Sequence, residues 1–378
     1  RGRHHRADRN GAVRKSPEAV KVGYHAPLPP APTGVAAYAA ALLAALRSHG
    51  TVELHARNPD VALYHLGNNQ LHREIYRRAL AEPGVVVLHD AVLHHFFLGA
   101  LGRHAYVDEF IYNYGEWHRA LAEDLWRGRA NSGFERRYFD YPMLKRIAER
   151  SHAVVVHNPA AARMVRRHAP GAAVIEIPHL FAPPAPPAGW EVIRMRRSLG
   201  AATHHFLFGV FGYLRESKRL FAVLRAFKRL RESQPHARLL VAGPFVSSDL
   251  ARAAGVVRLP YLAERDFWRA ALAVDACINL RYPAAGETSG IAIRLMGLAK
   301  PVLLTDGEEN SRYPAAACLR VEPGLAEEDS LWHNLFLLTS MRECAGEIGL
   351  RASGHIVERH RAVQIAEQYW DTLCAYRQ

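Results

Sequence analysis

Lysine is scarce in this 378-residue chain, although the formal net charge is +13. Only six lysines occur, so arginine carries nearly all of the positive charge. A basic balance favours anionic partners such as nucleotides, anionic lipid or nucleic acid. Because the arginines are spread along the chain and are not gathered between aromatic residues, nucleic acid is the least favoured of these partners.

Several sequence signatures are missing, and each absence excludes a class of site. The four cysteines form no C-x-x-C or zinc-ligand spacing, which favours a reducing, cytoplasmic compartment. Neither G-x-S-x-G nor G-x-G-x-x-G occurs, which excludes a serine-hydrolase elbow and a dinucleotide fingerprint. No D-x-D occurs, and the adjacent pair His94-His95 lacks metal-ligand spacing, so we predict that no metal is required. The apolar runs are too short to span a bilayer.

Short apolar runs recur in both halves of the chain, as in parallel sheets that are covered on both faces. The predicted strands of the first half are 22–24, 61–64, 85–88, 153–156 and 174–175. Those of the second half are 206–211, 239–242, 256–259, 276–280, 301–305 and 318–321. Amphipathic patterns between them, such as Gly34 to Leu46 and Leu220 to Leu230, predict helices. Alternating strands and helices predict an α/β protein with two Rossmann-like sheets.

The segments between these patterns indicate domain boundaries. Aromatic and apolar residues at helical spacing, Phe110, Tyr114, Trp117 and Leu121, predict a helical insertion whose stripe belongs to the core. The proline-rich segment after Phe181 excludes helix and central strand, so it is read as a linker. The predicted organisation is a disordered basic arm at 1–19, a first domain at 20–181 with a helical insertion at 92–150, a linker at 182–190, a second domain at 191–354, and a segment at 355–378 whose single helix (about 356–376) crosses back to the first domain.

The most informative motif is Gly286-Glu287-Thr288-Ser289-Gly290, which precedes an apolar helix and then Lys300-Pro301-Val302. Backbone N–H groups at the start of such a helix bind anions. The carboxylate of Glu287 accepts hydrogen bonds from sugar hydroxyls. A carboxylate beside a phosphate-binding helix start predicts a sugar-nucleotide site.

A basic motif follows the first strand of the second half. Gly212 is followed by Arg215 and Lys218, and the next helix begins directly afterwards. A guanidinium fork and an ammonium point charge at a helix start suit a diphosphate. Solvated loop charges are the alternative, and the Glu287 loop in the same half favours the binding site.

The candidate residues of the first half lie at strand ends or at a helix start. Gly34 lies at the turn into the first helix, where glycine lets the backbone approach a ligand. His89 ends a strand and is expected to bond a sugar hydroxyl, and Asp90 is expected to orient it or to act on an acceptor. Asn68 and Asn69 close another strand with amides that suit sugar hydroxyls, although turns use the same residues.

From about Val20 to Tyr376 the chain resembles family-four glycosyltransferases, which are retaining enzymes of the GT-B fold that use nucleotide sugars. The resemblance rests on Thr33 to Tyr38, Leu88-His89-Asp90, Gly212 to Lys218 and Gly286 to Val302. It implies two Rossmann-like domains that face each other across a cleft, with the nucleotide held by the second.

The resemblance implies roles for the motif residues of the second half, for His89 and for Gly34. The strand-end positions add Asp90, Asn68 and Asn69, and the departure described below adds Arg294. The catalytic residues would be Glu287, Lys218, Arg215 and His89; the donor-binding residues Gly34, Gly212, Ser289, Gly290, Ile291 and Arg294; and the acceptor-side residues Asp90, Asn68 and Asn69. The donor would be a UDP- or GDP-sugar, with no further cofactor and no metal.

One motif position departs from the family. Relatives carry a second Glu in this motif, where it holds the nucleotide ribose, but here counting from Glu287 reaches Leu295 and alignment on Lys300-Pro301-Val302 reaches Arg294. An arginine donates hydrogen bonds where a carboxylate accepts them, so Arg294 is expected to reach phosphate instead.

The predicted function is transfer of a sugar to a glycan, lipid-linked or small-molecule acceptor with retained configuration. Two alternatives stay open: a non-catalytic sugar-nucleotide-binding subunit on the same fold, and a nucleotide-sugar epimerase. Contact of Arg163, Arg166 and Arg167 with anionic lipid at the inner face of a membrane also stays open, because solvated arginines explain the same residues.

Overall fold

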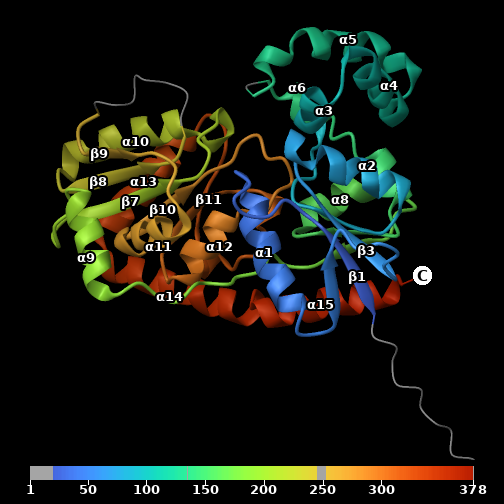
Figure 1. Cartoon of the computed structure of the whole chain (residues 1–378). Coiled ribbons are helices and arrows are strands. Elements are labelled where there is room, and N and C mark those ends of the chain that lie inside the picture. Colours follow the sequence, from blue (N-terminus) through green and yellow to red (C-terminus); the bar gives the residue numbers. More distant parts are fainter. Residues whose placement is uncertain (1–19, 134, 245–252, 378) are drawn as a thin grey trace, which may run out of the picture.

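The computed structural model describes residues 20–133, 135–244 and 253–377. The basic arm predicted at 1–19 lies outside the described residues. Two parallel six-stranded sheets form the two halves of the chain (Figure 1), which confirms the predicted α/β architecture. Among the described residues, no helix has the length and apolar composition needed to cross a membrane.

The first sheet has the strand order β2-β1-β3-β4-β5-β6. Its strands are β1 Lys21–His25, β2 Thr51–Leu54, β3 Val61–Leu66, β4 Val85–Leu88, β5 Ala153–Val156 and β6 Val174–Glu176. Val86 and Leu88 pack into one core and Val85 and Val87 into another, because helices cover both faces. The edge strand β2 was not predicted, since only Val52 of its four residues is buried.

One face of this sheet is covered by α1 (Gly34–Leu46), and the other by α2 (Arg73–Ala81) and α8 (Pro159–His168). Thr33 caps α1, since its Oγ1 accepts the N–H of Val35 at 3.4 Å. A short 3₁₀ helix, η1 (Gln70–His72), precedes α2.

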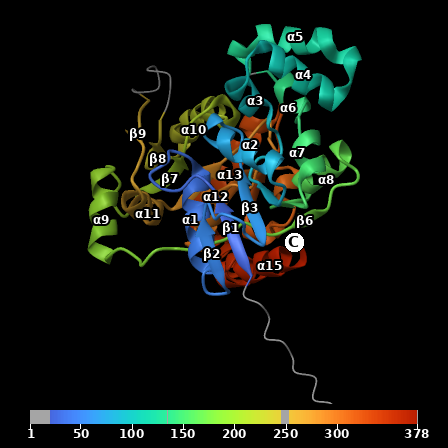
Figure 2. The ribbon, with the colours of Figure 1, turned by 45° about the vertical axis from the view of Figure 1, so that its right-hand side comes forward.

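The region at 92–150 is helical, as predicted, and its helices α4 and α5 project away from the first sheet (Figures 1 and 2). Its elements are α3 His94–Ala100, α4 Arg103–Tyr114, η2 Glu116–His118, α5 Arg119–Arg127, η3 Arg129–Asn131, α6 Arg137–Asp140 and α7 Lys145–Arg150. Phe110 is fully buried, but Trp117 is 99% exposed, so the prediction that the whole aromatic stripe belongs to the core is wrong at Trp117. Helix α4 ends at Tyr114, and Trp117 lies in the 3₁₀ turn η2, so the helical period is broken before that residue.

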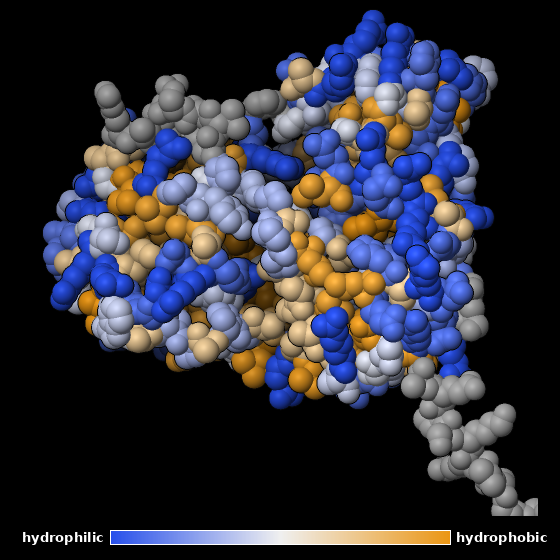
Figure 3. Space-filling view, in the orientation of Figure 1, coloured by the Kyte–Doolittle hydropathy of each residue, from blue (hydrophilic) through white to orange (hydrophobic). Residues whose placement is uncertain are grey.

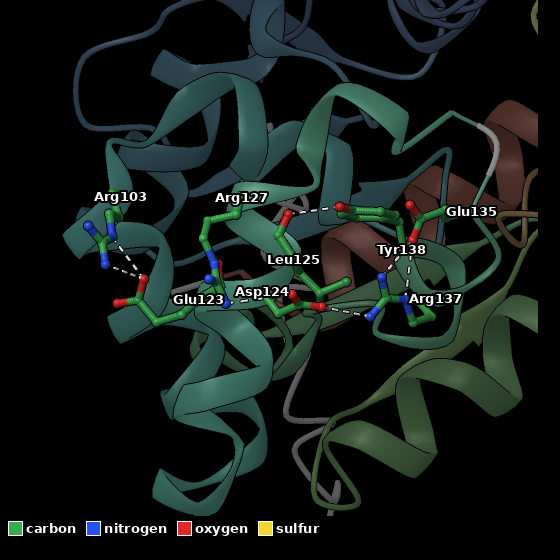
Figure 4. A network of polar contacts seen from close by, with 8 residues as sticks. All are labelled: Arg103, Glu123, Asp124, Leu125, Arg127, Glu135, Arg137 and Tyr138. Carbon is green, nitrogen blue, oxygen red and sulfur yellow. Dashed lines mark hydrogen bonds and ion pairs between the residues drawn. The ribbon is translucent and has the colours of Figure 1, made fainter.

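A polar network ties the outer helices of this region together (Figure 4). The buried hydroxyl of Tyr138 donates to the carbonyl of Leu125 at 2.8 Å. Arg137 bonds Asp124 at 2.9 Å, and Arg103 pairs with Glu123 at 2.7 Å. The ion pairs are exposed and stabilise little, so the buried tyrosine bond is the more important anchor.

The second sheet has the order β12-β11-β10-β7-β8-β9. Its strands are β7 Phe206–Phe211, β8 Ala237–Ala242, β9 Val256–Leu259, β10 Ala276–Asn279, β11 Val302–Thr305 and β12 Leu319–Val321. Its helices are α9 Gly189–Ser198, α10 Leu220–Ser233, α11 Glu264–Ala273, α12 Gly290–Gly297, α13 Glu327–Ser340 and α14 Arg342–Arg359. The predicted linker at 182–190 is therefore too long, because α9 already begins at Gly189.

The C-terminal segment is two helices rather than the single one predicted at 356–376. Helix α14 ends at Arg359, and α15 (Ala362–Ala375) follows. The carbonyl of His360 accepts the N–H of Phe181 at 2.6 Å, which fixes the break against the interdomain segment. Helix α15 then packs on α1, where the hydroxyls of Tyr38 and Tyr369 lie 2.9 Å apart, so the chain does return to the first half.

Candidate functional site

The Glu287 loop lies where the two halves meet, at the carboxyl end of β10. Gly286 has a φ of +68°, and a Cβ atom on it would lie 2.7 Å from the Cβ of Ala91 in the first half. The N–H of Ala91 donates to the carbonyl of Ala285 at 2.8 Å. Glycine is thus required at 286 by the backbone conformation and by the contact between the halves. Ser289 caps α12 by accepting the N–H of Ala292 at 3.3 Å.

Glu287 is held by a guanidinium and a backbone amide. Arg281 Nη1 donates to Oε1 at 2.6 Å, and the N–H of Ala285 donates to Oε2 at 2.7 Å. Burial acts to raise the pKa of Glu287, but Arg281 and the backbone N–H groups outweigh it, so the pKa is lowered. The side chain is therefore a fixed, ionised acceptor of hydrogen bonds.

The predicted basic motif lies beside this carboxylate. Burial, followed by the charge of Arg281, lowers the pKa of Lys218 to about 7, while Glu287 opposes the shift. Arg215 lowers the same pKa. The carbonyl of Ser217 accepts the N–H of Tyr282 at 2.8 Å, so the loop that carries Lys218 packs against the segment between Arg281 and Glu287. Gly212, at a φ of +102°, lies next to Ile291, since a Cβ on it would be 4.0 Å from Ile291 Cγ1. The loop after β7 and the start of α12 are thus neighbours.

Across the cleft, Asp90 faces these groups. Burial, followed by the charge of Glu287, raises the pKa of Asp90 to about 6, while the N–H of Asn68, Arg281 and Arg215 oppose the shift. Since Ala91, next to Asp90, bonds Ala285 in the Glu287 loop, the predicted residues of the two halves lie at one site. Gly34 begins α1 on the same side, and the nearby carbonyl of Pro32 accepts the hydroxyl of Tyr213 in the second half at 2.9 Å.

The sequence led us to expect that the His89 side chain is free to bond a sugar hydroxyl. In the structure its ring is instead held by other histidines. It is 8% exposed, and its Nε2 lies 3.0 Å from Nδ1 of His65 while its Nδ1 lies 3.4 Å from Nε2 of His157. Both ring nitrogens are therefore engaged with other histidines.

Asn68 and Asn69 have local structural roles that the acceptor-side prediction did not include. The Oδ1 of Asn68 accepts the N–H of Phe96 at 2.8 Å, and its Nδ2 lies 3.2 Å from Nδ1 of His95. Asn69 caps η1 by accepting the N–H of Leu71 at 3.0 Å. The amide oxygens of both residues shape the turn after β3, and both polar atoms of the Asn68 amide are engaged.

Arg294 is not directed at a phosphate. It pairs with Glu264 of α11 at 3.2 Å, and its guanidinium carbon lies 5.1 Å from the ring centre of Phe267. Leu295 is fully buried in the core of the second half. The prediction that Arg294 binds phosphate is therefore not supported by its contacts.

Three further residues were missed by the sequence analysis. Arg281 directly follows a strand end, a position that could have identified it. Asn158 donates from Nδ2 to the carbonyl of Gly286 at 2.9 Å and to Thr288 Oγ1 at 3.0 Å. His179 approaches the start of α12, because a Cβ on Gly290 would lie 3.3 Å from its Nε2. The sequence does not mark Asn158 or His179 as site residues, since their partners in the Glu287 loop and at the start of α12 lie more than a hundred residues away.

Figure 3 shows a recess where the halves meet, with hydrophilic side chains along its rim. A cavity of about 300 Å³ adjoins Glu287 and is lined by residues of both halves. It reaches from the loops after β10 and β11 to Phe139 in the helical insertion.

Within the described residues, the three-histidine group that could hold a metal ion is His204, His205 and His236. It lies at the amino ends of β7 and β8, the opposite edge of the sheet from the Glu287 loop. His205 Nδ1 accepts the N–H of Ala202 at 2.9 Å, which puts the proton of the neutral ring on Nε2 and works against metal binding there.

Because several histidines are buried, we expect the fold to lose stability in acid. Burial lowers the pKa of His157 and of His360 to about 4, and lowers that of His65, His89 and His179 well below the ordinary value. Unfolded imidazoles titrate near 6.5, so the unfolded chain binds more protons below that pH and the free energy of unfolding falls as the pH drops. We expect a loss of about 2 kcal/mol for each such histidine at pH 5. Thermal unfolding at pH 7.5, 6 and 5 measures this.

His65→Asn should flatten that pH dependence, whereas the same change at exposed His104 should leave it unaltered. If stability falls equally steeply with pH in the wild type and in His65→Asn, the buried histidines do not set the acid stability.

Arg219, next to Lys218, is expected to contribute to the stability of the fold. It has a φ of +56° and caps α10, and its Nε donates to both carboxylate oxygens of Glu327, at 3.0 and 2.8 Å. Glu327 is 2% exposed, so Arg219→Ala should destabilise the fold by about 3–5 kcal/mol by leaving a buried charge unpaired. Arg219→Gly should cost about 1 kcal/mol less, because glycine accepts the left-handed backbone. Urea unfolding of both variants measures the difference, and equal losses would argue against strain at this residue.

Three solved structures resemble this fold over nearly its full length. HepE from Anabaena in complex with UDP-glucose has a TM-score of 0.65 at 14% identity, covering 94% of this chain and 100% of that one. Sucrose-phosphate synthase from Thermosynechococcus elongatus has a TM-score of 0.63 at 13% identity, covering 94% and 99%. WaaG, a glycosyltransferase involved in lipopolysaccharide biosynthesis, has a TM-score of 0.60 at 13% identity, covering 93% and 99%.

Searches of protein-family models and of curated proteins give no match to this sequence. At such low identity the structural likeness establishes the architecture. The two facing Rossmann-like halves with a helical insertion in the first are therefore a GT-B fold.

Proposed function

We propose that this chain is a glycosyltransferase that moves a sugar from a nucleoside-diphosphate sugar to a hydroxyl acceptor with retained configuration. The observation that carries the proposal is the packing of three loops at the carboxyl edge of the second sheet, those of Lys218, Glu287 and Asp90. The N–H of Tyr282 donates to the carbonyl of Ser217, and the N–H of Ala91 donates to that of Ala285. Ligands of open α/β sheets bind at such an edge. HepE, of the same fold, has been solved with UDP-glucose, which supports a nucleotide sugar as the ligand.

The proposed transfer needs no covalent bond to the protein. The bond between the anomeric carbon and the diphosphate oxygen breaks, and its electron pair leaves with the nucleoside diphosphate. The acceptor oxygen forms the new bond on the same face, and its proton passes to the departing phosphate oxygen. Lys218, Arg215 and the N–H groups at the start of α12 lie where they would stabilise the charge that develops on the diphosphate. Glu287 would fix the sugar through its hydroxyls.

A donor screen tests the proposal. Thermal stabilisation by UDP-, GDP- and ADP-sugars identifies the nucleotide, since a ligand that binds only the folded state raises the melting temperature. Release of nucleoside diphosphate from that donor, with and without acceptors, then measures turnover, and NMR of the product gives its anomeric configuration. Stabilisation by no nucleotide sugar would refute the proposal.

A non-catalytic nucleotide-sugar-binding subunit is the second candidate. The observation that favours it is the Arg294–Glu264 pair, which leaves no carboxylate of α12 at the expected ribose position. Binding without nucleoside-diphosphate release across a broad acceptor panel would favour this candidate. Conversion of the sugar without such release would instead indicate an epimerase.

A further inference from the structure

The cavity beside Glu287 has a lining suited to hydroxyl groups. Its lining includes Arg136, Phe139 and Asp140 of the first half and Asn279, Arg281, Glu287, Ser289, Thr305, Asp306 and Glu309 of the second. Neither Lys218 nor Arg215 lines it, so the cavity extends away from the basic motif. Phe139 offers a ring face, against which the C–H groups of a sugar can pack.

The charges of this lining are unbalanced. Four of its side chains are carboxylates and two are guanidinium groups. Both guanidinium groups already face carboxylates of the lining: Arg281 bonds Glu287 at 2.6 Å, and Arg136 bonds Asp140 at 3.4 Å. Asp306 pairs with Arg320, which lies outside the lining, at 3.6 Å. Glu309 therefore remains as the excess negative charge. Burial, and then the charges of Glu287 and Glu308, raise the pKa of Glu309, as expected for a carboxylate among carboxylates.

One buried acceptor of the lining lacks a donor. Asn279 is 4% exposed, and its Oδ1 has no hydrogen-bond partner among the described residues. An unpaired buried oxygen is costly, so a ligand that brings an O–H or N–H group to it gains binding energy. This observation is independent of the carboxylates, and it points to a ligand that donates hydrogen bonds.

We infer that this cavity binds the acceptor, and that the acceptor is an uncharged saccharide rather than a phosphate-bearing one. The inference rests on the proposed function and specifies its acceptor. Sugar hydroxyls can donate to Asn279 and Glu309, whereas a phosphate would meet the carboxylate of Glu309, which no cation of the lining neutralises.

Matched pairs of acceptors test this inference. The probes are the methyl glycosides of glucose, galactose, mannose and N-acetylglucosamine, each compared with its 6-phosphate. Binding is measured by calorimetry with the nucleoside diphosphate of the identified donor present, and transfer is measured separately. We expect a neutral glycoside to bind about tenfold or more tightly than its 6-phosphate.

Two variants sharpen the test. Glu309→Gln should reduce the preference for the neutral glycoside about tenfold, because it removes the excess charge of the lining. Asn279→Ala should raise the KM for the acceptor more than it raises the KM for the donor. Glu347→Gln on α14, which removes an exposed carboxylate paired with Arg351, is the matched control and should change neither quantity.

The outcomes separate this inference from the proposed function. Tighter binding of a 6-phosphate, or binding of none of the neutral glycosides, would overturn the acceptor assignment even if the donor is hydrolysed. A change in donor KM alone on Glu309→Gln would overturn it too, by assigning the cavity to the transferred sugar. Binding of neutral glycosides without hydrolysis of any donor would support the acceptor assignment and count against catalysis.

Discussion

Lys218→Ala is expected to lower the turnover of a nucleotide sugar by about two to three orders of magnitude, the usual effect of removing a preorganised charge from a developing anion. Lys218 lies with Arg215, Arg281 and Glu287 at the edge of the second sheet. The ammonium group is partly desolvated before any ligand arrives, so its attraction for a diphosphate is stronger than that of a solvated lysine. The measurement is nucleoside-diphosphate release at saturating donor.

The pH dependence of the same reaction provides an independent check. Since the pKa of Lys218 is lowered to about 7, the free enzyme loses this positive charge as the pH rises, and kcat/KM for the donor should fall above about pH 7. Lys218→Arg keeps its charge at every working pH and should lose that alkaline decline. Lys228→Ala, an exposed lysine on α10, is the control and should retain wild-type turnover. Full turnover by Lys218→Ala would remove this residue from the mechanism.

The sequence predicts the two sheets well because both faces of each are covered, so the strands appear as continuous apolar runs. The edge strand β2 escapes that rule because its residues are mostly exposed. The break between α14 and α15 was not predicted either. There the position of His360 is set by a hydrogen bond to Phe181, and the apolar period of the helix does not reveal a contact so distant in sequence.

Motif residues were easier to identify than their partners. Glu287 and Lys218 could be selected because each follows a strand and precedes a helix, which places both at the carboxyl edge of one sheet. Whether a polar side chain at such an edge stays free depends on its neighbours in space. Asn68 and His89 have the same sequence context as ligand-binding residues, yet their polar atoms are taken by Phe96, His65 and their neighbours.

Glu287→Gln is the second variant with a large expected effect, about a hundredfold loss in turnover, because a neutral amide holds sugar hydroxyls less strongly than a carboxylate. Glutamine keeps an oxygen that can accept the N–H of Ala285, so the loop geometry should survive. Glu287→Ala is less informative, since it leaves Arg281 without its buried partner and should destabilise the fold by about 3–5 kcal/mol. Turnover and urea unfolding of both variants separate the two effects.

The charge of Glu287 also acts on both neighbouring titrating groups, so the same variant should shift the pH profile in a defined direction. Glu287 raises the pKa of Lys218 and adds to the burial that raises that of Asp90. In Glu287→Gln both pKa values should fall, and the alkaline decline of kcat/KM should begin below pH 7. Removing the exposed charge of Glu328, which pairs with Arg225 on α10, should leave the profile in place. If Glu287→Gln lowers turnover but leaves the pH profile of kcat/KM unshifted, Glu287 contacts the sugar without electrostatic coupling to Lys218. The two residues would then not form one charged cluster.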